Sequence, residues 1–120
     1  MDFDPDSFKV LSPDASFWEA DLPAILDYYQ TTYFAGAEPV RQIAFAALPD
    51  SPACVFPTIG RIEIDSHFRT FAKLCCFLVL HELINYKLFL RHRVVQPYSG
   101  REFRDEVNTL WNAGAYEGLL

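Results

Sequence analysis

A run of seven consecutive apolar residues at positions 74–80 constrains this chain more than any other feature. It leads directly into His81 and Glu82, and the helix-start signal Asp65-Ser66 precedes it, so we expect one long helix over residues 67–91. A helix that is apolar on all sides is normally the buried centre of its domain. The run is far shorter than the roughly 20 residues of a membrane span. It therefore predicts a central helix and no membrane partner.

The pattern around this helix predicts an α+β fold. Helices are expected at residues 22–35 and 99–112. A short helical turn is expected before Asp21, because Ser12-Pro13-Asp14 is a helix-start signal and residues 16–19 fit a capping box. Strands are expected at residues 39–48, 53–56 and 60–65, and the alternating charges of the last one suit an exposed edge. The expected architecture is a small, mainly antiparallel three-stranded sheet packed on helices.

The length of 120 residues corresponds to a single domain. Residues 1–11 are acidic and predict a loosely held lead-in, and residues 12–120 are expected to form the domain. The apolar tail at residues 115–120 is expected to pack back onto it. Nothing in the sequence indicates an oligomeric state.

Charge and cysteine content exclude several classes of protein. The formal net charge is −6 and the ten basic residues are scattered, whereas nucleic-acid binding needs a basic face. Three cysteines, two of them adjacent, do not form a disulfide framework and are expected to be small core residues. The N-terminus lacks a secretory signal pattern, so a cytoplasmic protein is expected.

His81 and Glu82 carry the strongest chemical signal. In metallopeptidases, two histidines at i and i+4 on one helix face ligate zinc, and the Glu after the first histidine activates the zinc-bound water. The residue at i+4 here is Asn85, so the motif reads His-Glu-Leu-Ile-Asn and is incomplete.

With these residues, the chain resembles the SprT-like family of zincin-type metallopeptidases over roughly residues 20–118. Residues 60–65, Gly-Arg-Ile-Glu-Ile-Asp, are similar to the strand that precedes that family's active-site helix. Residues 78–86 are similar to its motif helix, and residues 99–103, Ser-Gly-Arg-Glu-Phe, to the segment that carries its third ligand. The resemblance implies a minimal zincin-like domain, with a central motif helix.

The resemblance also assigns roles to individual residues. His81 matches the first zinc ligand and Glu82 the general base, while Asn85 and Ser99 stand at the positions of two lost ligands. Amide and hydroxyl oxygens are poor zinc ligands beside imidazole. No cofactor is therefore expected, and zinc only if the site is functional.

Asn85 and Ser99 also have structural explanations. Asn85 can form a hydrogen bond with His81, four residues before it. Ser99 can be the N-cap of the last helix, with Glu102 completing a capping box. Neither His67 nor His92 restores the ligand set, because both lie many residues from His81 along the same helix.

Three functions are compatible with this pattern. The favoured one is a degenerate, pseudoenzyme-like domain without zinc peptidase activity, which binds or scaffolds a protein or peptide partner through an aromatic groove beside the old site. The second is an active metal-dependent peptidase or hydrolase with atypical ligands and Glu82 as the general base. The third is a partner-binding protein whose surface is unrelated to the relic pocket; its apolar patch would lie at the chain ends, formed by Phe3, Phe8, Tyr116, Leu119 and Leu120.

Overall fold

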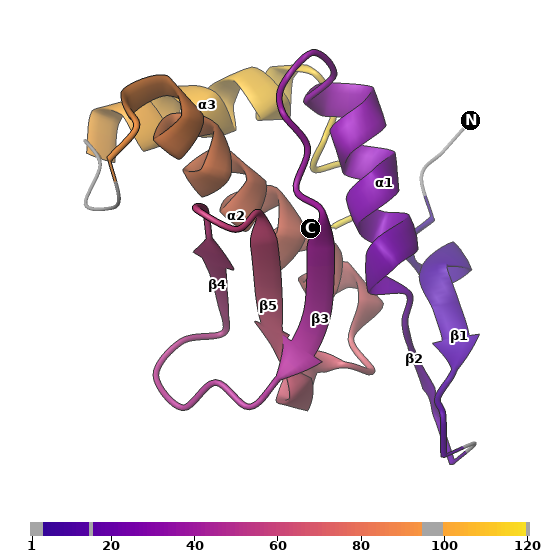
Figure 1. The fold of residues 1–120 in the computed structure, drawn as a ribbon. Helices are drawn as coiled ribbons and strands as arrows, with labels where there is room; N and C mark the ends of the chain where they lie inside the picture. Colours follow the sequence, from indigo (N-terminus) through magenta and orange to yellow (C-terminus); the bar gives the residue numbers. More distant parts are fainter. Residues whose placement is uncertain (1–3, 15, 95–99, 120) are drawn as a thin grey trace.

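The structure is a computed structural model that describes residues 4–14, 16–94 and 100–119. Within them, one long helix packs against a three-stranded sheet, two further helices pack against this long helix, and a small hairpin lies to one side (Figure 1). The helices are α1 (Leu22–Tyr33), α2 (Ala72–His92) and α3 (Gly100–Asn112). The strands are β1 (Lys9–Leu11), β2 (Trp18–Ala20), β3 (Gln42–Ala46), β4 (Ala53–Phe56) and β5 (Arg61–Asp65), and two short 3-10 helices are η1 (Pro5–Phe8) and η2 (Ser66–Phe68).

The α+β class and the central position of α2 are confirmed. Cys75, Val79, Leu80, Ile84 and Leu88 of this helix are fully buried. In β5, Ile62 and Ile64 are fully buried as well, and they belong to the same core cluster as the buried residues of α2. The helix therefore forms the centre of the core, as the apolar run predicts. No helix in the described part of the chain is long and apolar enough to span a membrane.

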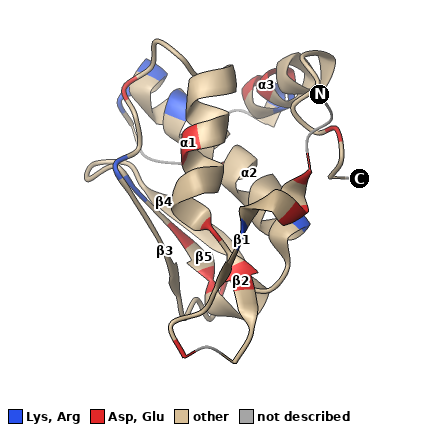
Figure 2. Cartoon of the chain, turned by 90° about the vertical axis from the view of Figure 1, so that its right-hand side faces the viewer, with Lys and Arg blue, Asp and Glu red and all other residues tan. Residues whose placement is uncertain are grey.

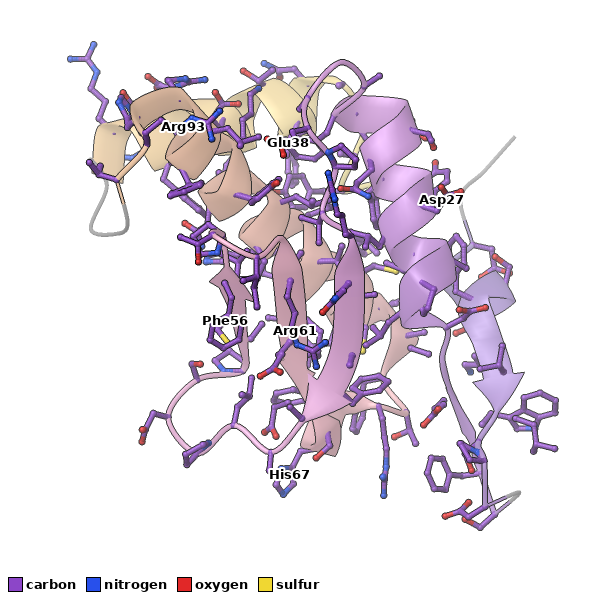
Figure 3. All side chains as sticks on the ribbon, in the orientation of Figure 1. Asp27, Glu38, Phe56, Arg61, His67 and Arg93 are labelled. Carbon is purple, nitrogen blue, oxygen red and sulfur yellow. The ribbon has the colours of Figure 1, made fainter. Side chains whose placement is uncertain are left out.

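The main sheet differs from the prediction in its strand order, which is β3-β5-β4. β5 lies in the centre, parallel to β3 and antiparallel to β4, so the sheet is mixed rather than mainly antiparallel. The predicted exposed edge strand is thus the central one. Its charged residues are accommodated on the face away from α2, where Arg61 Nε donates to Glu63 Oε2 at 2.9 Å (Figure 3).

The segment before α1 forms a hairpin instead of the predicted helical turn. β1 pairs with β2 in antiparallel register, with Leu11 opposite Trp18. The Asp14 carboxylate accepts hydrogen bonds from the hydroxyls of Ser12 and Ser16 and from the Ser16 amide, which lowers its pKa to about 2. These serines and Asp14 therefore stabilise the hairpin loop and do not cap a helix.

Residues 5–11, in the predicted lead-in, also form secondary structure. η1 contacts α2, Pro5 is buried, and Phe8 packs against Tyr28 of α1 with ring centroids 5.9 Å apart. The boundary between the lead-in and the domain stays a prediction.

The ends of α1 and α2 show how side-chain contacts set helix boundaries. Asp21 caps α1 by accepting a hydrogen bond from the Ala24 amide at 3.2 Å, so this helix begins where it is predicted to begin. Asp65 does not cap α2, because its carboxylate accepts from the Leu48 amide and contacts the His67 ring. α2 therefore begins at Ala72, later than predicted, after the short helix η2.

The C-terminal tail packs back onto the core as predicted. Ala115, Tyr116 and Leu119 are buried, and the positive φ of Gly114 turns the chain at the end of α3. The predicted apolar patch at the chain ends is therefore wrong for Tyr116 and Leu119, while Phe3 and Leu120 lie outside the described residues. Large apolar side chains that are exposed lie elsewhere, at Leu11, Trp18, Ile59, Phe71 and Trp111.

Candidate functional site

The residues of the incomplete motif lie in the middle of α2 but point in different directions. Successive residues of a helix are rotated by about 100°, so His81 and Glu82 cannot face the same neighbour. His81 is exposed on the side of α3, whereas Glu82 and Asn85 are buried.

Glu82 is a buried carboxyl group with one amide partner. Glu82 is 5 % exposed. Asn85 Nδ2 donates a hydrogen bond to Glu82 Oε2 at 3.5 Å. Burial raises the pKa of Glu82 to about 7, and the Asn85 hydrogen bond opposes that shift only weakly. Among the described residues, no Lys or Arg forms an ion pair with it. The carboxyl group is therefore partly protonated at neutral pH.

The neighbourhood of Glu82 extends to strand β4. Burial raises the pKa of the Cys54 thiol, and the negative charges of Glu63 and Glu82 add to this effect. The other two thiols, Cys75 and Cys76, are fully buried, and burial raises the pKa of each to about 12. None of the three cysteines is thus a ready thiolate donor at neutral pH.

His81 is in contact with the last helix. Its ring packs against that of Phe103 with centroids 4.7 Å apart, and partial burial under this contact lowers its pKa. Phe103 belongs to the segment that resembles the third-ligand segment of the SprT-like family, so the structure brings this segment beside His81. Asn85 donates its hydrogen bond to Glu82 and not to His81, the partner expected from the sequence.

The other two histidines are engaged elsewhere. His67 contacts Asp65 at 3.1 Å, and His92 contacts Glu102 on α3 at 2.5 Å. The contact of His92 is part of a network between α2 and α3, in which Lys87 and Arg91 both donate to Glu106. Burial raises the pKa of Glu106, but these two cations outweigh it and the net shift is downward.

The residues that the structure describes do not offer a set of zinc ligands. In the described residues, no three His, Cys, Asp or Glu side chains gather closely enough to hold a metal ion. Zinc peptidases need three protein ligands, and of the matched positions only His81 offers one of the usual type. Ser99 lies outside the described residues, so both its ligand position and its capping role stay predictions.

The fold is metallopeptidase-like. The chain superimposes on the crystal structure of the metallopeptidase zymogen abylysin of Pyrococcus abyssi with a TM-score of 0.60 and 18 % sequence identity, over 82 % of this chain and 87 % of that one. This likeness concerns the fold alone. No protein-family model and no curated protein sequence matches the chain.

Aromatic side chains lie beside His81, where the favoured hypothesis expects an aromatic groove, but the sequence did not predict which residues form this surface. Phe77 and Trp111 both contact Tyr116, with ring centroids 5.9 Å apart in each pair, and Trp111 is 57 % exposed. Phe77 and His81 of α2, Phe103 and Trp111 of α3, and the buried Tyr116 that contacts Phe77 and Trp111 make up what we call the aromatic face. The sequence signal was weak, because the tail that brings Tyr116 to the helices is distant from α2 in the chain.

Proposed function

We propose that this chain is a SprT-like zincin domain that has lost its zinc centre and acts as a binding module for a protein or peptide. The observation that carries the proposal is the state of Glu82. A general base beside zinc must be an accessible carboxylate that reaches the metal-bound water. Here the carboxyl group is buried and accepts a hydrogen bond from the residue that replaces the second ligand.

The aromatic face supports the binding part of the proposal. Aromatic side chains that remain partly exposed around a helix pair are typical of protein-binding surfaces, where Trp and Tyr contribute most of the energy. Phe77 is 37 % exposed and Trp111 57 % exposed on this face. A partner with apolar side chains would bury both.

The second candidate is a metal-dependent hydrolase with atypical ligands. It is favoured by the retention of Glu82 itself, because a buried carboxyl group without a cation is costly in a purely structural helix. In this case the metal would draw ligands from side chains outside the three matched positions.

One assay distinguishes the two candidates. Fluorescently labelled, unfolded casein is mixed with the protein in the presence of zinc, and both binding by anisotropy and cleavage are recorded. We expect binding without cleavage. Trp111→Ala should weaken binding about five- to tenfold, since truncating a central interface aromatic costs about 1 kcal/mol or more.

The matched control is Trp18→Ala. Trp18 is 59 % exposed but lies on β2, far from α3 in the fold (Figure 1). This variant should bind casein like the unmodified protein. Cleavage that disappears in Glu82→Gln would refute the proposal in favour of the hydrolase, and equal effects of the two tryptophan variants would refute the role of the aromatic face.

A further inference from the structure

A polar cavity of about 430 Å³ lies at the C-terminal end of α2, outside the site described above. Its walls come from three segments that are distant in sequence: residues 38–41 before β3, the turn at residues 57–60 between β4 and β5, and the last turns of α2. His81, Glu82 and Asn85 are not among its lining residues. The cavity is therefore a separate feature with its own chemistry.

Three charged side chains line this cavity without ion pairs. They are Glu38, Arg41 and Arg93, and within the described residues none of them has an oppositely charged group within ion-pair distance. Figure 3 shows Glu38 and Arg93 at the same upper end of the molecule, one on the loop after α1 and the other at the end of α2. Figure 2 shows that Lys and Arg are otherwise spread over several elements and mixed with acidic residues. The lining carries a net charge of +1.

The hydroxyl of Tyr86 faces the same space. A Cβ placed on Gly60 would lie 3.9 Å from the Tyr86 hydroxyl oxygen and 3.7 Å from the Arg41 backbone nitrogen. Burial raises the pKa of Tyr86, as does Glu38, while Arg41 and Arg93 oppose the shift. All three charged groups thus act on one hydroxyl, which stays protonated at neutral pH and is able to donate a hydrogen bond.

The backbone at Arg93 is unusual. Arg93 has φ 57°, and no other non-glycine residue in the described part of the chain has a positive φ. Its amide donates to the Phe89 carbonyl at 2.6 Å and closes α2, at a position where Gly or Asn is usual. A left-handed arginine at the wall of a polar cavity is the kind of backbone outlier that gathers at functional sites.

We propose that this cavity binds a small monocarboxylate with an apolar group. The carboxylate would lie between the guanidinium groups of Arg41 and Arg93 and accept a hydrogen bond from Tyr86. Its apolar group would contact Pro57, Ile59 and Phe89, which also line the cavity. Guanidinium groups pair with carboxylates through two parallel hydrogen bonds, which gives both strength and orientation.

The charge balance favours a monoanion over a phosphate. The carbonyl end of α2 contributes roughly half a negative charge near the cavity. Glu38 adds one further negative charge, so the positive charge of the two arginines exceeds the sum of the negative charges by less than one unit. This balance favours one carboxylate and disfavours a dianion. The ligand is either a free small acid or the C-terminal carboxylate of a peptide.

The probe is N-acetyl-leucine, compared with the uncharged N-acetyl-leucinamide of nearly equal shape. Amide signals of Arg41 and Gly60 are followed by NMR during titration. We expect N-acetyl-leucine to shift them and to bind at least tenfold more tightly than the amide or inorganic phosphate. A six-residue peptide that ends in leucine tests the second source: tighter binding than N-acetyl-leucine assigns the site to peptide C-termini, and weaker binding assigns it to free acids.

Two variants test the assigned contacts. Arg41→Gln and Arg93→Asn should each weaken binding of N-acetyl-leucine about tenfold, and Asn is chosen because it tolerates a positive φ. Lys73→Gln, which removes an exposed cation at the opposite end of α2, should leave it unchanged. Equal binding of the acid and the amide, or unchanged binding in both cavity variants, would overturn the proposal.

Discussion

Replacing Glu82 with glutamine should raise the free energy of unfolding at pH 8 by up to about 3 kcal/mol and change it little at pH 4. The pKa of Glu82 is raised from its ordinary value of 4.5 to about 7 in the folded protein, because the carboxyl group is buried. A raised carboxyl pKa means that the folded state holds its proton more tightly than the unfolded chain does. At about 1.36 kcal/mol per pKa unit, ionisation of Glu82 lowers the stability by about 3 kcal/mol.

The contribution of Glu82 to the stability of the fold depends on pH. Below 4.5 the carboxyl group is protonated in both states, so its full contribution to stability is present. As the pH rises through about 7 that contribution is lost, and above it the charged group opposes folding. A glutamine side chain at this position cannot ionise, so the variant should lack this loss.

Urea unfolding at pH 4, 6 and 8 measures the effect directly. Glu117→Gln is the matched control, because Glu117 is an exposed carboxylate outside the core. It should show the same pH dependence as the unmodified protein. Lower stability of Glu82→Gln at pH 8 would contradict the account, because it would mean that an ionised Glu82 is held by a cation.

Restoring two histidines should create a zinc site in this fold. The double variant Asn85→His with Ser99→His would add one imidazole four residues after His81 on α2 and a second directly before Gly100 of α3. With His81 these make the three-histidine set of a catalytic zinc centre. We expect one zinc per chain with a Kd below about 1 μM, or roughly 8 kcal/mol of binding free energy.

The control for this variant keeps the number of histidines and misplaces one. Asn108 is exposed on α3, eight residues after the first residue of this helix, Gly100, and so about 12 Å along it. Asn85→His with Asn108→His should bind zinc at least tenfold more weakly. Equal affinity in the two double variants would show that position 99 does not belong to the ligand set.

The parts of the fold that could be predicted depend on local signals. Strand β4 was predicted with its observed bounds, and α1 with its observed start, because Asp21 and Pro23 mark a helix start in the sequence itself. The central helix followed from its apolar run. The residues within each of these segments encode them, whichever segments pack beside them in the fold.

The predictions that are wrong concern features that depend on contacts between segments distant in the sequence. Alternating charges made β5 resemble an edge strand, but pairing of its Ile62 and Ile64 with β3 on one side and β4 on the other places it in the centre. Asp14 and Asp65 were interpreted as helix starts, yet their carboxylates accept hydrogen bonds that hold a loop and a strand end. An acidic residue gives the same sequence signal in either role.

The candidate site was only partly predictable. The positions of His81, Glu82 and Asn85 on one helix followed from their spacing. The hydrogen-bond partner of Asn85 did not, because the sequence does not show that Glu82 is buried while His81 is exposed. The cavity between Arg41 and Arg93 had no sequence signal, because those residues lie 52 positions apart and meet only in the folded chain.

The central claim, that a zincin-like fold here persists without a zinc centre, is tested most directly by the metal content of the protein. The chain is purified without chelators and without a histidine tag, dialysed against micromolar zinc, and analysed by mass spectrometry for metal per chain. The account predicts well below about 0.1 zinc per chain, since roughly one usual ligand remains where three are needed. One tightly held zinc per chain would contradict it.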